Sequence, residues 1–294
     1  MRLFLLILLS PFFFTVANGQ AGQLVREAET LLEAYEQQYN SGSRQKARLL
    51  LDEGIALLEG SELDTLTGVF YNLYAFYAFN EGRIDLALQK QLKAVHHFER
   101  GFGAAEPTAF AMHNAAFLFQ RVSEHADSAL HYFQGALAIY QALDRPLDVA
   151  DEYRNIGLVH LSQNDYTAAQ GSYLRALAVL DDIGEAEVGR MPPADQVLYA
   201  KTLAWLYLNL ADLKLELDDI RQLRVYLQYS QDVLARFAAE FPELETELKE
   251  GQARMYAYLG HYERSIHLYQ QLSEAFLEQQ TNDWLRIRLR VLQL

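Results

Sequence analysis

The sequence contains no cysteine, which excludes disulfide bonds, thiolate metal ligands and a cysteine nucleophile. It also lacks a Gly-x-Ser-x-Gly nucleophile elbow and a phosphate loop ending in Gly-Lys-Ser or Gly-Lys-Thr. The Gly-Phe-Gly run at residues 101–103 begins like a dinucleotide-binding pattern, but it lies between two predicted helices instead of after a strand, so we interpret it as a linker. Because no catalytic pattern is found, we predict that the protein is not an enzyme and uses no cofactor.

Histidine pairs suited to a metal are missing as well. None of the eight histidines lies three or four residues from another, and that spacing is the one that places two imidazoles on the same face of a helix. The neighbours His96 and His97 would point about 100° apart on a helix. We therefore predict no helix-borne metal site.

Positive charge is scarce. The chain has 25 lysines and arginines against 39 aspartates and glutamates, which gives a formal net charge of -14 at pH 7. An acidic surface repels polyanions. We therefore do not expect the protein to bind nucleic acid.

Only the N-terminus carries a long apolar run. Leu3–Val16 is 14 residues long, is almost free of polar groups, follows Arg2 and is followed by small residues. A membrane-spanning helix needs about 20 apolar residues, and Pro11 interrupts this run. We predict a secretory signal peptide over residues 1–19 that is cleaved after Gly19, with a retained membrane anchor as the alternative.

Cleavage there leaves a mature chain of 275 residues (294 minus 19). No second apolar stretch of membrane-spanning length follows in the sequence, so no integral membrane segment is expected after cleavage. We expect a periplasmic or secreted protein.

The rest of the chain carries a helical repeat. In one segment large residues mark a stripe on a first helix, and small residues stand where a second helix must approach it: Tyr153, Ile156, Gly157 and His160, then Tyr166, Ala169, Tyr173 and Ala176. A small residue followed four places later by a large or long one recurs at intervals of 40, 42 and 40 residues, at Ala47, Ala87, Ala129 and Ala169.

This pattern resembles the tetratricopeptide (TPR) repeat, whose usual length is about 34 residues. The longer interval implies roughly six extra residues in the helices or outer turn of each unit. An Asn followed by two apolar or small residues recurs in the first helices, at Asn72, Asn114, Asn155 and Asn209. For the first two of these, one extra residue is expected in the turn that follows.

The resemblance implies an all-α fold, a right-handed superhelical α-solenoid of about six TPR-like helix pairs plus a C-terminal helix. The pairs are predicted at residues 22–59, 64–99, 107–143, 147–181, 195–238 and 243–279, and the terminal helix at 282–294. The stretch from Asp181 to Ala194, with Gly184, Gly189, Pro192 and Pro193, is interpreted as a long loop on a functional edge.

In TPR proteins the first helices line a concave groove, so the resemblance implies a protein or peptide ligand there. The candidate groove residues are Tyr71, Asn72, His113, Asn114, Phe117, Arg121, Arg154, Asn155, Leu158 and Trp205, with Ala75, Phe79, Asp151, Leu161, Leu208 and Asp212 at further groove positions. Arg121 and Arg154 suit an extended peptide or a helix that carries an acidic group. The alternative is that the aromatic residues of 70–79 are core residues of stacked helices.

No lysine falls on these positions, so the carboxylate clamp of some TPR domains is not expected. The preferred interpretation is a non-catalytic, exported TPR scaffold that binds a protein or peptide in a bacterial cell envelope. The alternative is the extracytoplasmic ligand-sensing part of a longer signal-transduction protein, to whose TPR regions the chain is also similar. Apolar residues lie around much of the predicted helix 282–294, which makes it an expected site of self-association or partner contact.

Overall fold

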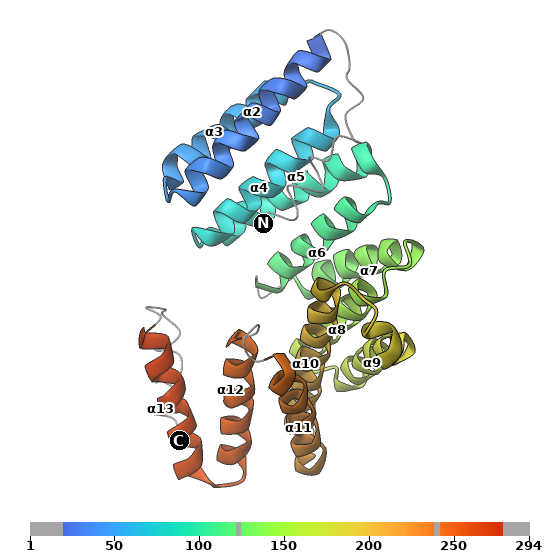
Figure 1. Ribbon diagram of the computed structural model, residues 1–294, viewed down its shortest axis with the longest axis vertical. Coiled ribbons are helices and arrows are strands. Elements are labelled where there is room, and N and C mark those ends of the chain that lie inside the picture. Colours follow the sequence, from blue (N-terminus) through green and yellow to red (C-terminus); the bar gives the residue numbers. More distant parts are fainter. Residues whose placement is uncertain (1–19, 122–124, 238–241, 279–294) are drawn as a thin grey trace. The chain divides into compact units, whose positions relative to one another are not determined.

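The structure is a computed structural model that describes residues 20–121, 125–237 and 242–278. The predicted signal peptide and the predicted terminal helix at 282–294 lie outside these ranges. Within them, every regular element is a helix (Figure 1): α2 Gln20–Asn40, α3 Arg44–Leu58, α4 Asp64–Asn80, α5 Ile84–Phe102, α6 Glu106–Arg121, α7 Ala126–Ala142, α8 Pro146–Ser162, α9 Tyr166–Val188, α10 Pro193–Glu216, α11 Ile220–Phe237, α12 Pro242–Tyr258 and α13 Tyr262–Glu278.

The chain divides into two compact units, Met1–Tyr132 and Phe133–Leu294, with the boundary inside α7. Within each unit, helices that follow one another in sequence pack together, as α4 does with α5 and α8 with α9 (Figure 1). The first helices of successive pairs also touch, α2 with α4 in unit 1, and α8 with α10 and α10 with α12 in unit 2. The predicted all-α helical-repeat solenoid is confirmed.

The two helices of a pair are joined by a recurring three-residue turn. Its middle residue has a positive φ of 59° to 79° in the five pairs whose turns are described, at Gly42, Gly82, Asn164, Asp218 and Gly260. Glycine adopts this left-handed conformation freely, and Asn and Asp tolerate it best among the other residues. The extra turn residue predicted for the second pair is absent, since only residues 81–83 separate α4 from α5, and the turn of the third pair includes residues 122–124, which lie outside the described residues.

The repeat spacing is visible in the burial of the second helices. The four spaced alanines are fully buried, and the side chains four places later are at most 2 % exposed. Leu223 and Ser265, 2 % and 0 % exposed, take the same place in α11 and α13. We call these positions the anchors: Ala47, Ala87, Ala129, Ala169, Leu223 and Ser265.

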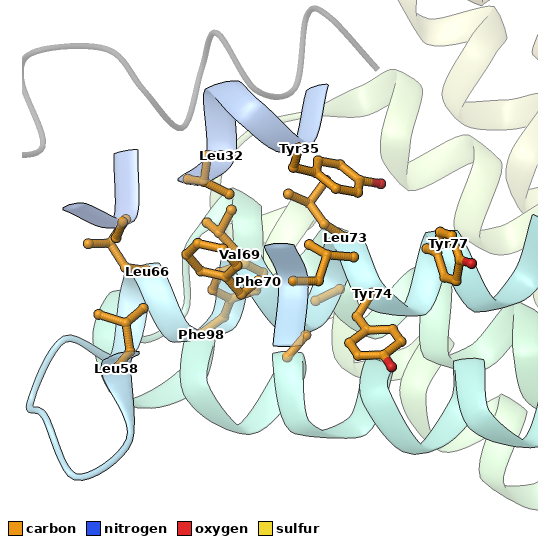
Figure 2. Packing of buried hydrophobic residues seen from close by; sticks show 14 of the residues in the cluster. Leu32, Tyr35, Leu58, Leu66, Val69, Phe70, Leu73, Tyr74, Tyr77 and Phe98 are labelled. Atoms are coloured by element: carbon orange, nitrogen blue, oxygen red, sulfur yellow. The ribbon is translucent and has the colours of Figure 1, made fainter. Parts of the chain in front are cut away.

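Glycine allows the closest helix crossings. A Cβ atom on Gly157 would lie 2.3 Å from Cε1 of Tyr173, which agrees with the contact predicted at Gly157. The sequence analysis missed an equivalent contact in unit 1, where a Cβ on Gly54 would lie 2.0 Å from Cε1 of Phe70. Phe70 belongs to the core cluster of unit 1, where Leu32 of α2 packs over α4 (Figure 2).

The predicted long loop after Asp181 is wrong. Helix α9 continues to Val188, interrupted only at Gly184, which has a φ of 70° and a ψ of 150°. Helix α10 then begins at Pro193, where proline suits the first helical turn because it has no N–H to leave unpaired. Gly184 thus interrupts a helix and Pro193 starts one, and only residues 189–192 link α9 to α10.

Candidate binding surface

One repeat position faces the neighbouring first helix. It lies eleven residues before the anchor and is held by Glu36, Phe76, Leu158, Asp212 and Arg254. Contacts with a neighbouring first helix are found there for Phe76, Asp212 and Arg254. In the third pair Phe117, twelve residues before the anchor Ala129, makes the corresponding contact with α4. The side chains at and beside this position make most of the contacts described below.

In unit 1 these side chains form an aromatic row of Tyr39 on α2, Phe76 and Phe79 on α4, and Phe117 on α6. The ring centroids of Tyr39 and Phe76 are 5.9 Å apart, as are those of Phe79 and Phe117. Arg121 is exposed and its guanidinium carbon lies 4.8 Å from the centroid of Phe117. Phe76 is 41 % exposed, so its interpretation as a core residue is wrong. The row offers ring faces and a cation to a ligand.

In unit 2 charged and amide side chains take the place of the rings. We call them the ionic row: Asp151, Arg154, Asn155, Asn209, Asp212, Glu216 and Arg254. The first half of this row lies on α8. Arg154 donates from Nε and Nη2 to Oδ1 of Asp151 at 3.0 and 2.8 Å. Asn155 donates to the other carboxylate oxygen at 3.1 Å. Arg154 also reaches Oδ1 of Asn209 on α10, at 3.5 Å. Asp151 thus fixes the arginine, whose side chain is 14 % exposed.

The second half of the ionic row joins α10 to α12. Arg254 pairs with Asp212 at 2.5 Å and with Glu216 at 3.5 Å. The three side chains are 31 %, 39 % and 47 % exposed. The row therefore carries charges of alternating sign across three successive first helices, and its second half is partly exposed.

The buried Tyr173 hydroxyl lies near this row and has no hydrogen-bond partner among the described residues. Burial raises its pKa well above the ordinary value, while Arg154 lowers this pKa and Asp212 raises it. The hydroxyl therefore stays protonated at physiological pH.

The remaining predicted groove residues lie elsewhere or do not meet one another. Tyr71 stacks on His97 of α5, its own second helix, with centroids 5.5 Å apart. Asn72 is buried and accepts a hydrogen bond from Gln91 at 3.1 Å. His113, Asn114 and Leu158 are half-buried on their helices. Trp205 packs against the core cluster of α10–α12, which favours a structural role.

Arg121 and Arg154 belong to different units, so their proposed joint action stays a prediction. Sequence reasoning missed Tyr39, Glu216 and Arg254. A signal for Arg254 exists, because it stands eleven residues before Ser265 as Asp212 stands before Leu223. It was overlooked because Ser265 is not an alanine.

Two other kinds of site, a metal site and a membrane span, are absent from the described residues. No group of three or more histidine or acidic side chains there is arranged to hold a metal ion. None of the described helices combines the length and the apolar character needed to cross a membrane.

Comparison with protein-family models and with curated proteins finds no match. Among solved structures, the chain is similar to BtubC (BKLC) from P. vanneervenii, with 24 % identity and a TM-score of 0.59 over 73 % of this chain and 82 % of that one. It is similar to the TPR-like repeats of a kinesin light chain from Podosopora anserina, with 12 % identity and a TM-score of 0.57 over 73 % and 97 %. A Rap protein complexed with Competence and Sporulation Factor gives 15 % identity and a TM-score of 0.58 over 90 % and 80 %. The fold is that of TPR-like repeat proteins.

Proposed function

We propose that this chain is a non-catalytic scaffold that binds a protein or an extended peptide along its first helices, and that it works in the bacterial cell envelope. The observation that carries the proposal is the ionic row, in which Asp151 holds Arg154, and Asp212 and Arg254 hold each other, while all of these side chains remain partly exposed.

The row suits an extended ligand for two reasons. Its side chains are already fixed by ion pairs, so binding costs little further side-chain entropy. Its charges alternate from helix to helix, which gives a peptide of complementary pattern one register. Arginine is also among the residues most often found at interaction hot spots.

The fold comparison supports the same proposal at a coarser level. A Rap protein with this fold has been crystallised with Competence and Sporulation Factor, so a repeat stack of this kind can hold another factor. A fold hosts many functions, and the ionic row is what points to a ligand in this chain.

The envelope location rests on the N-terminal sequence alone. Mature protein recovered from the envelope should begin at Gln20, and its intact mass should equal that of residues 20–294. A recovered chain that still begins at Met1 would contradict export by cleavage.

The binding proposal is tested by exchanging one ion pair. The double variant Asp212→Arg, Arg254→Asp keeps an ion pair between α10 and α12 but inverts the charges that a ligand meets. Tagged wild-type protein, this variant and a control, Arg224→Asp on the exposed face of α11, are purified from the envelope, and bound proteins are identified by mass spectrometry. We expect a partner on the wild type and the control that is absent from the double variant.

Equal recovery of the same partner by all three proteins would show that the ionic row is structural. If no protein is recovered but a small molecule co-purifies and is lost in the double variant, the chain is instead a ligand-sensing region.

A further inference from the structure

Three tyrosines form a cluster where α10 meets α11. The ring centroids of Tyr207 and Tyr229 are 5.3 Å apart, those of Tyr207 and Tyr226 are 6.3 Å apart, and those of Tyr226 and Tyr229 are 6.4 Å apart. The interplanar angles are 53°, 23° and 74° in the same order. Tyr229 is 47 % exposed and the other two rings are half-buried. We call Tyr207, Tyr226 and Tyr229 the tyrosine cluster.

The same place in two other helix pairs holds a cation over a tyrosine ring. In the second pair, Nζ of Lys93 lies 5.1 Å from the ring centroid of Tyr71. In the fourth pair, Cζ of Arg175 lies 6.0 Å from that of Tyr153. Each tyrosine stands sixteen residues before its anchor (87 minus 71, 169 minus 153), and each cation stands six residues after it (93 minus 87, 175 minus 169).

The fifth pair keeps the tyrosine but not the cation. Tyr207 stands sixteen residues before the anchor Leu223, and Tyr229 stands six residues after it (223 minus 207, 229 minus 223). A third ring therefore occupies the place of Lys93 and Arg175. Among the described residues, no lysine or arginine lies over any ring of the tyrosine cluster.

Two carboxylates, those of Asp181 and Asp219, act on the hydroxyls of the cluster. Burial raises the pKa of the Tyr207 hydroxyl, and the carboxylate of Asp181 and the neighbouring tyrosines raise it further. Burial likewise raises the pKa of Tyr226, with Tyr229 and Asp219 adding to the shift. Asp181 lies on α9. Ring faces and carboxylates attract the same kind of ligand, an organic cation.

We propose that the tyrosine cluster binds an arginine or lysine side chain presented by another protein, which takes the place of the intramolecular cation found in the second and fourth pairs. The net charge of -14 favours a basic partner. The cluster belongs to the contact between α10 and α11, whereas the ionic row joins first helices. The proposal therefore goes beyond the proposed function and does not depend on it.

The test uses the full chain labelled with 3-fluorotyrosine and followed by fluorine NMR. The probe is a short peptide of glycine and serine with a single central arginine and blocked ends, and the matched probe carries citrulline, which is uncharged, in its place. The variant Tyr229→Arg supplies the missing cation from within the chain, as Arg175 does in the fourth pair. The control Tyr262→Arg makes the same change at another exposed tyrosine, which is 52 % exposed.

We expect the arginine peptide to shift the resonances of Tyr207, Tyr226 and Tyr229, each assigned by its Tyr→Phe variant, and the citrulline peptide to leave them in place. In Tyr229→Arg the dissociation constant should rise about 5- to 30-fold, with an unchanged melting curve, and in Tyr262→Arg it should hardly change. Equal shifts with citrulline, equal weakening in the control, or no shift in the wild type would overturn the proposal.

Discussion

The two units use the same repeat position for different chemistry. In unit 1, Phe76 and Phe117 face the neighbouring first helices with rings, whereas in unit 2 Asp212 and Arg254 face one another as an ion pair. The anchors beneath them are alike, small or branched and almost fully buried. This difference indicates that the anchors determine the fold, whereas the partly exposed first-helix position is free to vary and can therefore serve recognition.

The largest effects are expected at the close helix crossings, which both units contain. Gly54→Ala would place a Cβ atom 2.0 Å from the buried ring of Phe70, and Gly157→Ala would place one 2.3 Å from that of Tyr173. Each variant should lower the free energy of unfolding by about 1–3 kcal/mol. Gly171→Ala is the control, because nothing lies within 4 Å of its Cβ position, and it should stabilise α9 slightly. Urea unfolding followed by circular dichroism measures all three. A stable Gly157→Ala protein would mean that this crossing does not determine the repeat.

The next largest effect should come from the aromatic row. Phe79→Ala removes a half-buried ring that packs on the Ala78, Ala87 and Leu118 cluster and contacts Phe117, and we expect a loss of about 1–3 kcal/mol. The loss should not fall when salt is added, because the contacts carry no charge. The same unfolding measurement at low salt and in 1 M NaCl tests this, and a loss that disappears in salt would contradict it.

A smaller and salt-dependent effect is expected from the ionic row. Asp212→Asn weakens the contact with Arg254, whose side chain is partly exposed, and should cost less than about 1 kcal/mol at low salt and almost nothing in 1 M NaCl. Asp232→Asn, an exposed site on α11 outside the row, is the matched control. A large loss of unfolding free energy that persists in 1 M NaCl would mean that the ionic row stabilises the fold and is not a binding surface.

The smallest effect concerns two buried tyrosine hydroxyls, one in the described part of each unit, that have no hydrogen-bond partner. Tyr35 in unit 1 and Tyr173 in unit 2 are both fully buried and have hydroxyls without a hydrogen-bond partner among the described residues. Tyr35→Phe and Tyr173→Phe should therefore leave stability unchanged or raise it by up to about 1 kcal/mol. A clear destabilisation in urea unfolding would reveal a partner for the hydroxyl, such as a bound water.

The helix pairs could be predicted from the sequence because the regular spacing of small residues in the second helices is enough to locate them. The alanine spacing marked four anchors, but Ser265 escaped notice since serine is small enough for the close contact without being apolar. The contacts of the site could not be predicted in the same way. Whether Tyr71 faces a groove or its own second helix depends on where the Asn stands in its helix, and this differs by one residue: Asn72 stands fifteen residues before its anchor and Asn155 fourteen (87 minus 72, 169 minus 155). Ion pairs between helices, such as Asp212 with Arg254, depend on which first helices are adjacent, which spacing within one repeat does not show.

The central claim, that the first helices receive the partner, is tested most directly by photo-crosslinking in cells. A benzophenone amino acid is placed at Leu158, which is half-buried on the first helix α8, or at Leu174, which is 48 % exposed on the second helix α9. The account predicts a crosslink to another protein from position 158 and none from position 174. A crosslink from position 174 alone would contradict it.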